Sequence, residues 1–130
     1  MSTTRRTFLA AATVAAANAG AATVKSNHPK LVHHVFFWLK NPGSTEDRSR
    51  LLAGLRTLTK IESVRSAHFG VPASTEKRDV VDNSFSVSEI LYFDDLAGQK
   101  IYQDHPIHKQ FVADCSGLWS KVVVYDAIEA

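Results

Sequence analysis

The segment 31–40 constrains this chain more than any other, because it is a β-strand pattern that is apolar on both sides. Successive side chains of a strand point to opposite faces of the sheet. One side carries His33, Val35, Phe37 and Leu39, and the other carries His34, Phe36 and Trp38. Neither side suits contact with water, so the sequence predicts a strand that is covered on both faces.

The rest of the chain predicts three more strands and two helical regions. A helix is expected over residues 45–60, with Ser44 as its cap, Asp47 in the reciprocal capping position and leucines at helical spacing. Strands are expected over 64–71, 85–93 and 121–125, with a polar loop over 73–83. Asp94 should cap a helix that runs to about residue 104, and residues 106–117 should continue helically. The order βαββαβ predicts an α+β, ferredoxin-like fold, an antiparallel sheet with its helices on one face.

Helices on one face leave the other face of such a sheet uncovered. Because the first strand is apolar on both sides, the second face also needs a cover. The most economical cover is a second copy of the chain related by a two-fold axis. We therefore expect a homodimer in which two sheets pair as a dimeric α+β barrel.

Residues 1–24 are expected to be a twin-arginine export signal with its processing region, and 25–130 a single domain. Arg5 and Arg6 precede Phe8-Leu9 and an Ala-rich run that reaches Ala22. The alternative is a frayed cytosolic tail. The uncharged run is too short and too rich in alanine to remain as a membrane anchor, so no stable membrane span is expected after its removal. The mature protein should be exported to the periplasm.

Charge and cysteine content argue against nucleic-acid binding and against an intrachain disulfide. Without Arg5 and Arg6 the count of Lys and Arg falls from 15 to 13, which equals the 13 Asp and Glu. The mature chain is then formally neutral and has no basic cluster, so nucleic-acid binding is not expected. Cys115 is the single cysteine and cannot form an intrachain disulfide. We interpret it as a small apolar residue on a helix.

The segment 102–108, with sequence YQDHPIH, is where we expect any chemistry. Proline disfavours helical geometry at the preceding residue, so one helix should end near His105 and the next begin at Pro106. His108 then lies in the first turn of the new helix, where the positive helix end disfavours imidazolium. Neutral His108 and Tyr102 could act as an acid/base pair. Alternatively, they only satisfy a helix junction, as we expect for His105.

Several spaced motifs together resemble a known family. They are HHVFFWLK at 33–40, Gly70, FDDL at 93–96, YQDHPIH at 102–108 and VVVYD at 122–126. In this order they resemble the stress-responsive α/β-barrel (Dabb) domain family over about residues 31–128. The resemblance implies a homodimer whose sheets close into a shared barrel, in agreement with the two-sided strand. It does not imply one reaction.

In a plant polyketide cyclase of that family, a tyrosine and a histidine spaced like Tyr102 and His108 are the proposed catalytic pair of a cofactor-free ring closure. The resemblance implies a ligand pocket between the sheet and the helices of one subunit. Its expected lining is His33, Val35, Phe37, Leu91, Phe111, Trp119, Val122 and Val124. Two residues depart from the cyclase. Glu89 replaces an apolar strand residue, and Gly54 falls near the position of a tyrosine.

Glu89 is included among the ligand-binding candidates because a buried carboxylate needs a partner or a raised pKa. His33 or His108 could be that partner if Glu89 points toward the helices. A one-residue shift in register would turn Glu89 toward the dimer barrel instead. The set His33, Glu89, His105 and His108 lacks tight metal-ligand spacing, so we expect no metal site. Nothing fixes a haem axial ligand, so we expect no cofactor.

Two functions remain open from the sequence. The first is binding of a small, largely apolar molecule between sheet and helices, with cofactor-free acid/base catalysis of the cyclase or isomerase kind through His108 and Tyr102. The alternative is a non-catalytic, stress-related dimeric protein with a binding or structural role. The residues do not name the ligand, and they leave open whether the protein is an enzyme.

Overall fold

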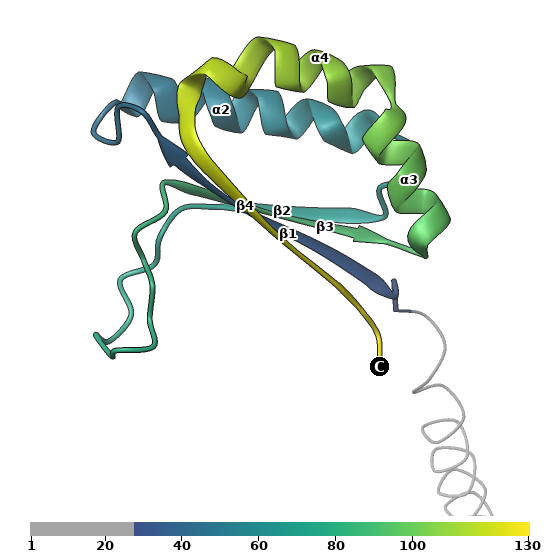
Figure 1. Ribbon diagram of the computed structural model, residues 1–130, viewed down its shortest axis with the longest axis horizontal. Helices are drawn as coiled ribbons and strands as arrows, with labels where there is room; N and C mark the ends of the chain where they lie inside the picture. Colours follow the sequence, from purple (N-terminus) through teal and green to yellow (C-terminus); the bar gives the residue numbers. More distant parts are fainter. Residues whose placement is uncertain (1–27) are drawn as a thin grey trace, which may run out of the picture.

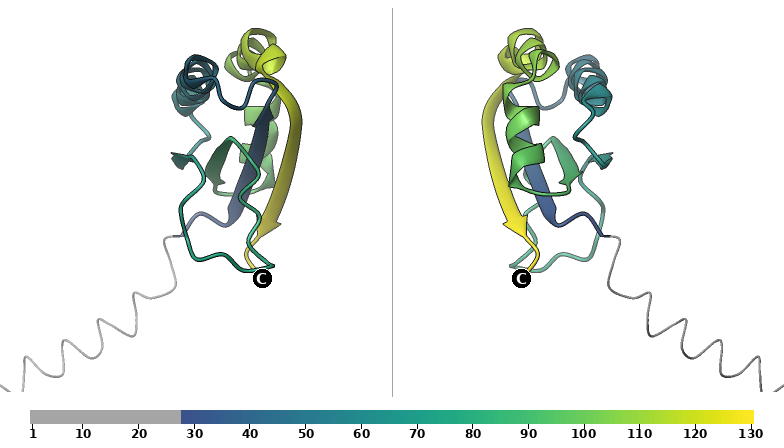
Figure 2. Two further views of the ribbon diagram at one scale, coloured as in Figure 1. Left: turned by 90° about the vertical axis from the view of Figure 1, so that its left-hand side faces the viewer. Right: turned by 90° about the vertical axis from the view of Figure 1, so that its right-hand side faces the viewer.

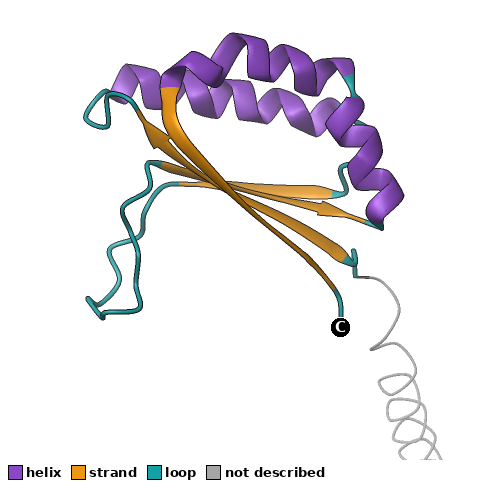
Figure 3. Ribbon diagram, viewed as in Figure 1, coloured by secondary structure: helices purple, strands orange, loops and turns teal. Residues whose placement is uncertain are grey.

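A computed structural model describes residues 28–130, so the predicted export signal over 1–24 lies outside the described part. Four strands form one sheet, namely β1 (Leu31–Leu39), β2 (Ser66–Gly70), β3 (Val87–Phe93) and β4 (Trp119–Ile128). Their spatial order is β2-β3-β1-β4, and each neighbouring pair is antiparallel. The strand β1 therefore lies inside the sheet, with β4 at one edge and β2 at the other (Figures 1 and 3).

The helices lie together on one face of this sheet. They are α2 (Thr45–Thr57), α3 (Leu96–Asp104) and α4 (Pro106–Cys115), with short 3-10 turns η1 (Leu58–Lys60) and η2 (Ser116–Leu118). Figure 2 shows α2 and α4 side by side above the sheet, and Figure 1 shows α3 at one end of them. The order βαββαβ and the ferredoxin-like α+β fold predicted from the sequence are thereby confirmed.

The alternation predicted for the first strand is present in β1. Leu31, His33, Val35, Phe37 and Leu39 are buried, and the residues between them are half-buried. The buried set faces the helices and meets Leu51, Leu55, Leu58 and Ile61, which are fully buried. Burying one such leucine or isoleucine side chain contributes about 1.5–3 kcal/mol, so this layer contributes substantially to stability.

The start of α2 differs in one detail from the predicted capping box. Ser44 Oγ accepts a hydrogen bond from the Asp47 backbone N–H over 3.1 Å, as expected. The carboxylate of Asp47 does not make the reciprocal bond to Ser44. It accepts a hydrogen bond from the Asn41 amide instead, over 3.3 Å, while the Ser44 N–H donates to the Asn41 carbonyl over 2.9 Å. The Asn41 carbonyl, in the turn before the helix, thus replaces the Asp47 carboxylate as acceptor for the Ser44 N–H.

The cap of α3 is Asp95, not Asp94 as the sequence predicted. Asp95 Oδ1 accepts a hydrogen bond from the Gly98 N–H over 2.8 Å. Asp94 lies one residue outside the helix, where its Oδ2 is 3.2 Å from the guanidinium of Arg65 at the start of β2. With two consecutive aspartates, the chain direction after β3 decides which carboxylate reaches the helix end.

The strand ends also differ from the predicted ones. The strand β4 is longer than the predicted 121–125, because it pairs with the whole of β1, from Leu39 opposite Trp119 to Leu31 opposite Ile128. The strands β2 and β3 are shorter than 64–71 and 85–93. Pairing with a neighbouring strand sets these limits, and residue preferences alone do not contain that information.

The sheet face opposite the helices is apolar and partly open. His34, Phe36 and Trp38 lie on it and are half-buried. The ring of Phe36 contacts Phe85 and Tyr125, with centroid separations of 5.0 and 6.1 Å, and Tyr125 is 64% exposed. Within residues 28–130, no helix is long and apolar enough to cross a membrane.

Candidate functional site

A cavity of about 170 Å³ lies between the sheet and the helices α3 and α4. It is lined by His33, Val35, Phe37, Glu89, Tyr102, Gln103, His108, Phe111, Val112, Trp119, Val122 and Val124. A dry apolar cavity of about 150 Å³ can hold benzene, so this space suits a one-ring molecule. Most of the wall is aliphatic or aromatic, and the polar groups are few, as in many small-molecule sites.

The structure brings the predicted site residues together, with one exception. Leu91, expected in the lining, does not contact the cavity. It is fully buried in the core, opposite His33 in the β1–β3 register. Gln103 and Val112 line the cavity and were not predicted. Val112 lies four residues after His108 on α4, so helical spacing could have found it. Gln103 directly follows Tyr102 on α3, and no spacing signal identifies it. The roles assigned to His108 and Tyr102 stay predictions.

Tyr102 lies between the two histidines of the cavity. Its ring meets that of His33 edge-on at a centroid distance of 5.6 Å and that of His108 at 4.8 Å. The residue is 1% exposed. Burial raises the pKa of the Tyr102 phenol well above its ordinary value, and the carboxyl groups of Glu89 and Asp126 add to the rise. Tyr102 is therefore a hydrogen-bond donor that keeps its proton.

His108 occupies the third position of α4, in its first turn. The imidazole is half-buried, and this burial lowers its pKa, with a further contribution from His33. The positive end of the helix acts in the same direction. His108 is thus neutral near neutral pH and able to accept a proton from a molecule in the cavity.

His33 is held by a residue that the sequence analysis missed. Asp126 on β4 lies opposite His33 in the register, and its Oδ1 is 2.6 Å from His33 Nδ1. A carboxylate only accepts hydrogen bonds, so the Nδ1–H of His33 donates to it. Asp126 shares its strand face with the predicted residues Val122 and Val124. Extending that alternation by two residues would have found it.

Glu89 is the buried carboxyl group of the site. It lies opposite Val35 in the register and is 2% exposed, so it points toward the helices and not toward the opposite face. Its Oε1 is 3.9 Å from His33 Nε2. Its Oε2 is buried and, among the described residues, has no hydrogen-bond partner. Burial raises the pKa of Glu89 to about 8, so the carboxyl is mostly neutral near neutral pH.

His105 serves the helix junction. Its backbone is extended, and its Nδ1 accepts a hydrogen bond from the Ile107 N–H over 3.0 Å, which caps α4 ahead of Pro106. Its Nε2 lies 3.6 Å from a carboxylate oxygen of Glu62. His105 does not line the cavity. Within residues 28–130, no three His, Cys, Asp or Glu side chains are arranged to hold a metal ion.

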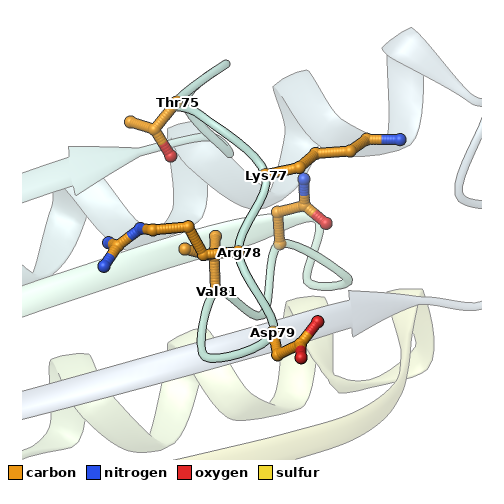
Figure 4. A pocket seen from close by; sticks show the side chains of 6 residues that line it. Thr75, Lys77, Arg78, Asp79 and Val81 are labelled. Atoms are coloured by element: carbon orange, nitrogen blue, oxygen red, sulfur yellow. The ribbon is translucent and has the colours of Figure 1, made fainter.

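A larger hollow of about 300 Å³ lies in the loop between β2 and β3, and it differs in kind from the cavity between sheet and helices. It is lined by Thr75, Lys77, Arg78, Asp79, Val81 and Asn83. Figure 4 shows these side chains spread along a single loop, with Lys77 and Arg78 extending to opposite sides in that view. Its lining residues are exposed, apart from the half-buried Val81. Such a surface offers no enclosed set of polar groups.

The fold and the cavity define a ferredoxin-like α+β protein with a small-molecule-sized space between its sheet and its helices. The chain belongs to the family described as the Stress responsive A/B Barrel Domain, Dabb, whose model matches residues 31–129. The resemblance inferred from the spaced motifs is thereby confirmed. No curated protein matches the sequence.

Solved structures share the fold at low sequence identity. A Dabb family protein with a ferredoxin-like fold from Mesorhizobium loti is 24% identical, with a TM-score of 0.63, and the match covers 77% of this chain and 96% of that one. A hydroxynitrile lyase from Passiflora edulis is 21% identical, with a TM-score of 0.65 and coverage of 78% and 95%. A dimeric ferredoxin-like protein from Thermobifida fusca is 16% identical, with a TM-score of 0.63 and coverage of 82% and 96%.

Proposed function

We propose that this protein is an exported homodimer that binds a small, largely apolar molecule between sheet and helices and catalyses a cofactor-free proton transfer on it. His108 is the base, and Tyr102 is the hydrogen-bond donor. The observation that carries the proposal is the convergence of His33, Glu89, Tyr102 and His108 on one mostly apolar cavity. Four titratable side chains in so small a space are expected of a site that handles protons.

The geometry suggests how the reaction would proceed on a carbonyl compound. Neutral His108 takes a proton from the carbon next to the carbonyl. The electron pair of the broken C–H bond then moves toward the carbonyl oxygen. Tyr102 donates a hydrogen bond to that oxygen as its negative charge develops. Return of the proton from His108 to another atom of the ligand completes an isomerisation. In a ring closure the carbanion attacks a second carbonyl of the ligand, and the alkoxide that forms takes the proton back from His108.

The enzymatic form of this proposal is supported by the hydroxynitrile lyase of Passiflora edulis, which shares the fold. A protein with this architecture can therefore carry an active site for a small organic molecule. Because a shared fold does not by itself determine function, that enzyme supports catalysis on a small organic molecule in general and does not identify the reaction of this chain.

The homodimer is supported by the apolar sheet face opposite the helices and by the dimeric state named for ferredoxin-like neighbours. The partly exposed Tyr125 and half-buried Phe36 lie on that face. A second copy would remove them from water, which is favourable by about 25 cal/mol per Å² of apolar surface. Export through the twin-arginine route rests on Arg5, Arg6 and the Ala-rich run after them.

Acetophenone is a suitable probe, since it combines one ring with C–H bonds next to a carbonyl. The mature protein should accelerate exchange of its methyl protons for deuterium in D₂O, measured by NMR. His108→Gln should lower the rate by about 100-fold, the usual contribution of a general base, with an unchanged thermal melting curve. Native mass spectrometry of the same sample should give the mass of a dimer.

Two results would contradict the proposal. Bound acetophenone whose exchange is no faster than in buffer would favour the alternative, a non-catalytic dimeric binding protein. A large loss of stability in His108→Gln without loss of exchange would assign His108 a structural role at the helix junction.

A further inference from the structure

Three polar side chains cross the sheet on the face that the helices cover. Asp126 is on β4, His33 is on β1 and Glu89 is on β3, which are neighbours in the order β4-β1-β3. The side chain of Asp126 is half exposed, whereas those of His33 and Glu89 are 7% and 2% exposed. The row therefore runs from solvent at the sheet edge to the floor of the cavity.

The hydrogen bond to Asp126 determines what His33 offers to the cavity. Because Nδ1–H donates to Asp126 Oδ1 over 2.6 Å, the neutral ring has its lone pair on Nε2. Nε2 faces Glu89, at 3.9 Å from Oε1. This distance is too long for a hydrogen bond between the two groups. His33 thus presents an acceptor that no described residue occupies.

Glu89 offers the complementary group. The carboxyl is buried, and burial raises its pKa to about 8, so its neutral form carries a proton that it can donate. Its Oε2 has no hydrogen-bond partner among residues 28–130. The unpaired Oε2 means that no described residue anchors the carboxyl there, and the oxygen that lies toward His33 is Oε1, whose hydrogen bond to a ligand is not already used.

One ligand atom can satisfy both side chains. A ligand oxygen placed about 2.8 Å from both His33 Nε2 and Glu89 Oε1 is compatible with the 3.9 Å between these two atoms. It must accept a hydrogen bond from the carboxyl and donate one to the imidazole. A hydroxyl does both. A carbonyl oxygen can only accept hydrogen bonds, and a carboxylate can only accept them and is also negatively charged.

We propose that His33 and Glu89 form a subsite that binds a neutral hydroxyl group, and that Asp126 is a positioning residue which holds His33 in the tautomer this requires. The inference rests on the proposed function, since it names the ligand class of the same cavity as a small apolar alcohol, enol or phenol. Anionic ligands are disfavoured, because no Lys or Arg among residues 28–130 lines the cavity.

Phenol, benzene and benzoate test this on the mature protein, with NMR titration of the methyls of Val35 and Val124 and of the histidine rings. Phenol should bind at least about tenfold more tightly than benzene, a ratio that one charge-free hydrogen-bond pair can supply. It should shift the His33 resonances, whereas benzene should not. Benzoate should bind more weakly than either.

Three variants identify the groups responsible. Glu89→Leu removes the donor, so the preference for phenol should fall to about twofold or less while benzene still binds. Glu89→Gln keeps an N–H donor and should restore part of the preference. Asp126→Asn, at an exposed position, should change the ring ¹⁵N shifts of His33 to those of mixed tautomers and lower phenol affinity alone. A merely structural Asp126 would leave the tautomer unchanged.

The outcomes separate this inference from the proposed function. Equal binding of phenol and benzene in the cavity overturns the hydroxyl subsite and leaves the proposed function standing. A preference for phenol that survives in Glu89→Leu and in Asp126→Asn also overturns the subsite. If neither phenol nor benzene perturbs the cavity residues, the proposed function fails and the subsite fails with it.

Discussion

The rings of Tyr102 and His108 meet edge-on, with centroids 4.8 Å apart and planes inclined by 62°. Tyr102 lies on α3 and His108 on α4, so the junction at His105 and Pro106 sets their relative position. Among the described residues, no hydrogen bond joins the two side chains. The contact orients both rings and leaves the phenol hydroxyl and the imidazole lone pair for a bound molecule.

Removing the Tyr102 hydroxyl should therefore affect activity more than stability. We expect Tyr102→Phe to lower the rate of acetophenone proton exchange by about tenfold or more, because the developing negative charge loses its donor. The free energy of unfolding should change by less than about 1 kcal/mol, since the hydroxyl makes no hydrogen bond to the described part of the chain. In the wild type the rate should rise with pH through the lowered pKa of His108 and then level off.

Tyr92→Phe is the matched control, because Tyr92 is half-buried on the opposite face of β3. Its exchange rate should equal that of the wild type. An undiminished rate in Tyr102→Phe would remove Tyr102 from the proposed mechanism.

Glu89 should make stability depend on pH. Its pKa rises from an ordinary 4.5 in the unfolded chain to about 8 in the folded protein, so folding favours the protonated carboxyl. The free energy of unfolding should be unaffected by this group below about pH 4.5, should fall as the pH rises to about 8, and should then level off. The upper limit of the loss is about 5 kcal/mol.

Urea unfolding at a fixed protein concentration measures this dependence. Glu89→Gln should lack the decline between about pH 5 and 8 that the wild type shows. If both proteins lose stability equally over this range, Glu89 is not the group that titrates.

Gly54 should resist replacement although it lies inside α2. Alanine ordinarily stabilises a helix interior by about 1 kcal/mol relative to glycine. Here an added Cβ would lie 2.5 Å from Cys115 Sγ and 3.2 Å from Phe111 Cδ1 on α4. We expect Gly54→Ala to lower the free energy of unfolding by about 1–3 kcal/mol through overpacking.

In a Cys115→Ala background, adding Gly54→Ala should lower the free energy of unfolding by much less than it does in the wild type, because the sulfur is the nearest obstacle. Gly43→Ala, with nothing within 4 Å of its added Cβ, should change stability by no more than about 0.5 kcal/mol. A stabilised Gly54→Ala protein would contradict close packing between α2 and α4.

A charge on the open sheet face should weaken self-association. Tyr125→Arg places a cation on the face that we propose a second copy covers, where Tyr125 is 64% exposed in the single chain. Sedimentation should show a dissociation constant raised by at least about 100-fold, because a charge buried without a partner is costly. Leu96→Arg, also exposed but on α3, should leave the dimer intact. A wild-type monomer would refute the dimer.

The two arginines at the start of the chain should be needed together for export. In a bacterial host with a twin-arginine pathway, Arg5→Lys combined with Arg6→Lys should leave the full-length protein in the cytoplasm. Cell fractionation followed by intact mass measurement would show this, and Lys25→Gln serves as the control. Unprocessed wild-type protein in the cytoplasm would contradict the predicted signal.

Part of the site could be predicted from local patterns, and the family resemblance implied most of the remaining cavity lining. The two-residue alternation of segment 31–40 placed His33, Val35 and Phe37 on one face, and Pro106 placed His108 in a first helical turn. Leu91 shows the limit of this reasoning. Its side chain is on the predicted face of β3, but it packs in the core and not against the cavity. Which of the two a strand residue contacts depends on the side chains that pack above it.

The sequence by itself determined the order of elements, the two-sided character of the first strand and the juxtaposition of Tyr102 with His108, because short-range periodicity and the geometry of proline fix these features. Only the tertiary structure decided that Asp126 holds His33, 93 residues away, and that Glu89 points toward the helices. Both depend on the register between strands that are distant in the chain. A register shift of one residue would reverse every such contact.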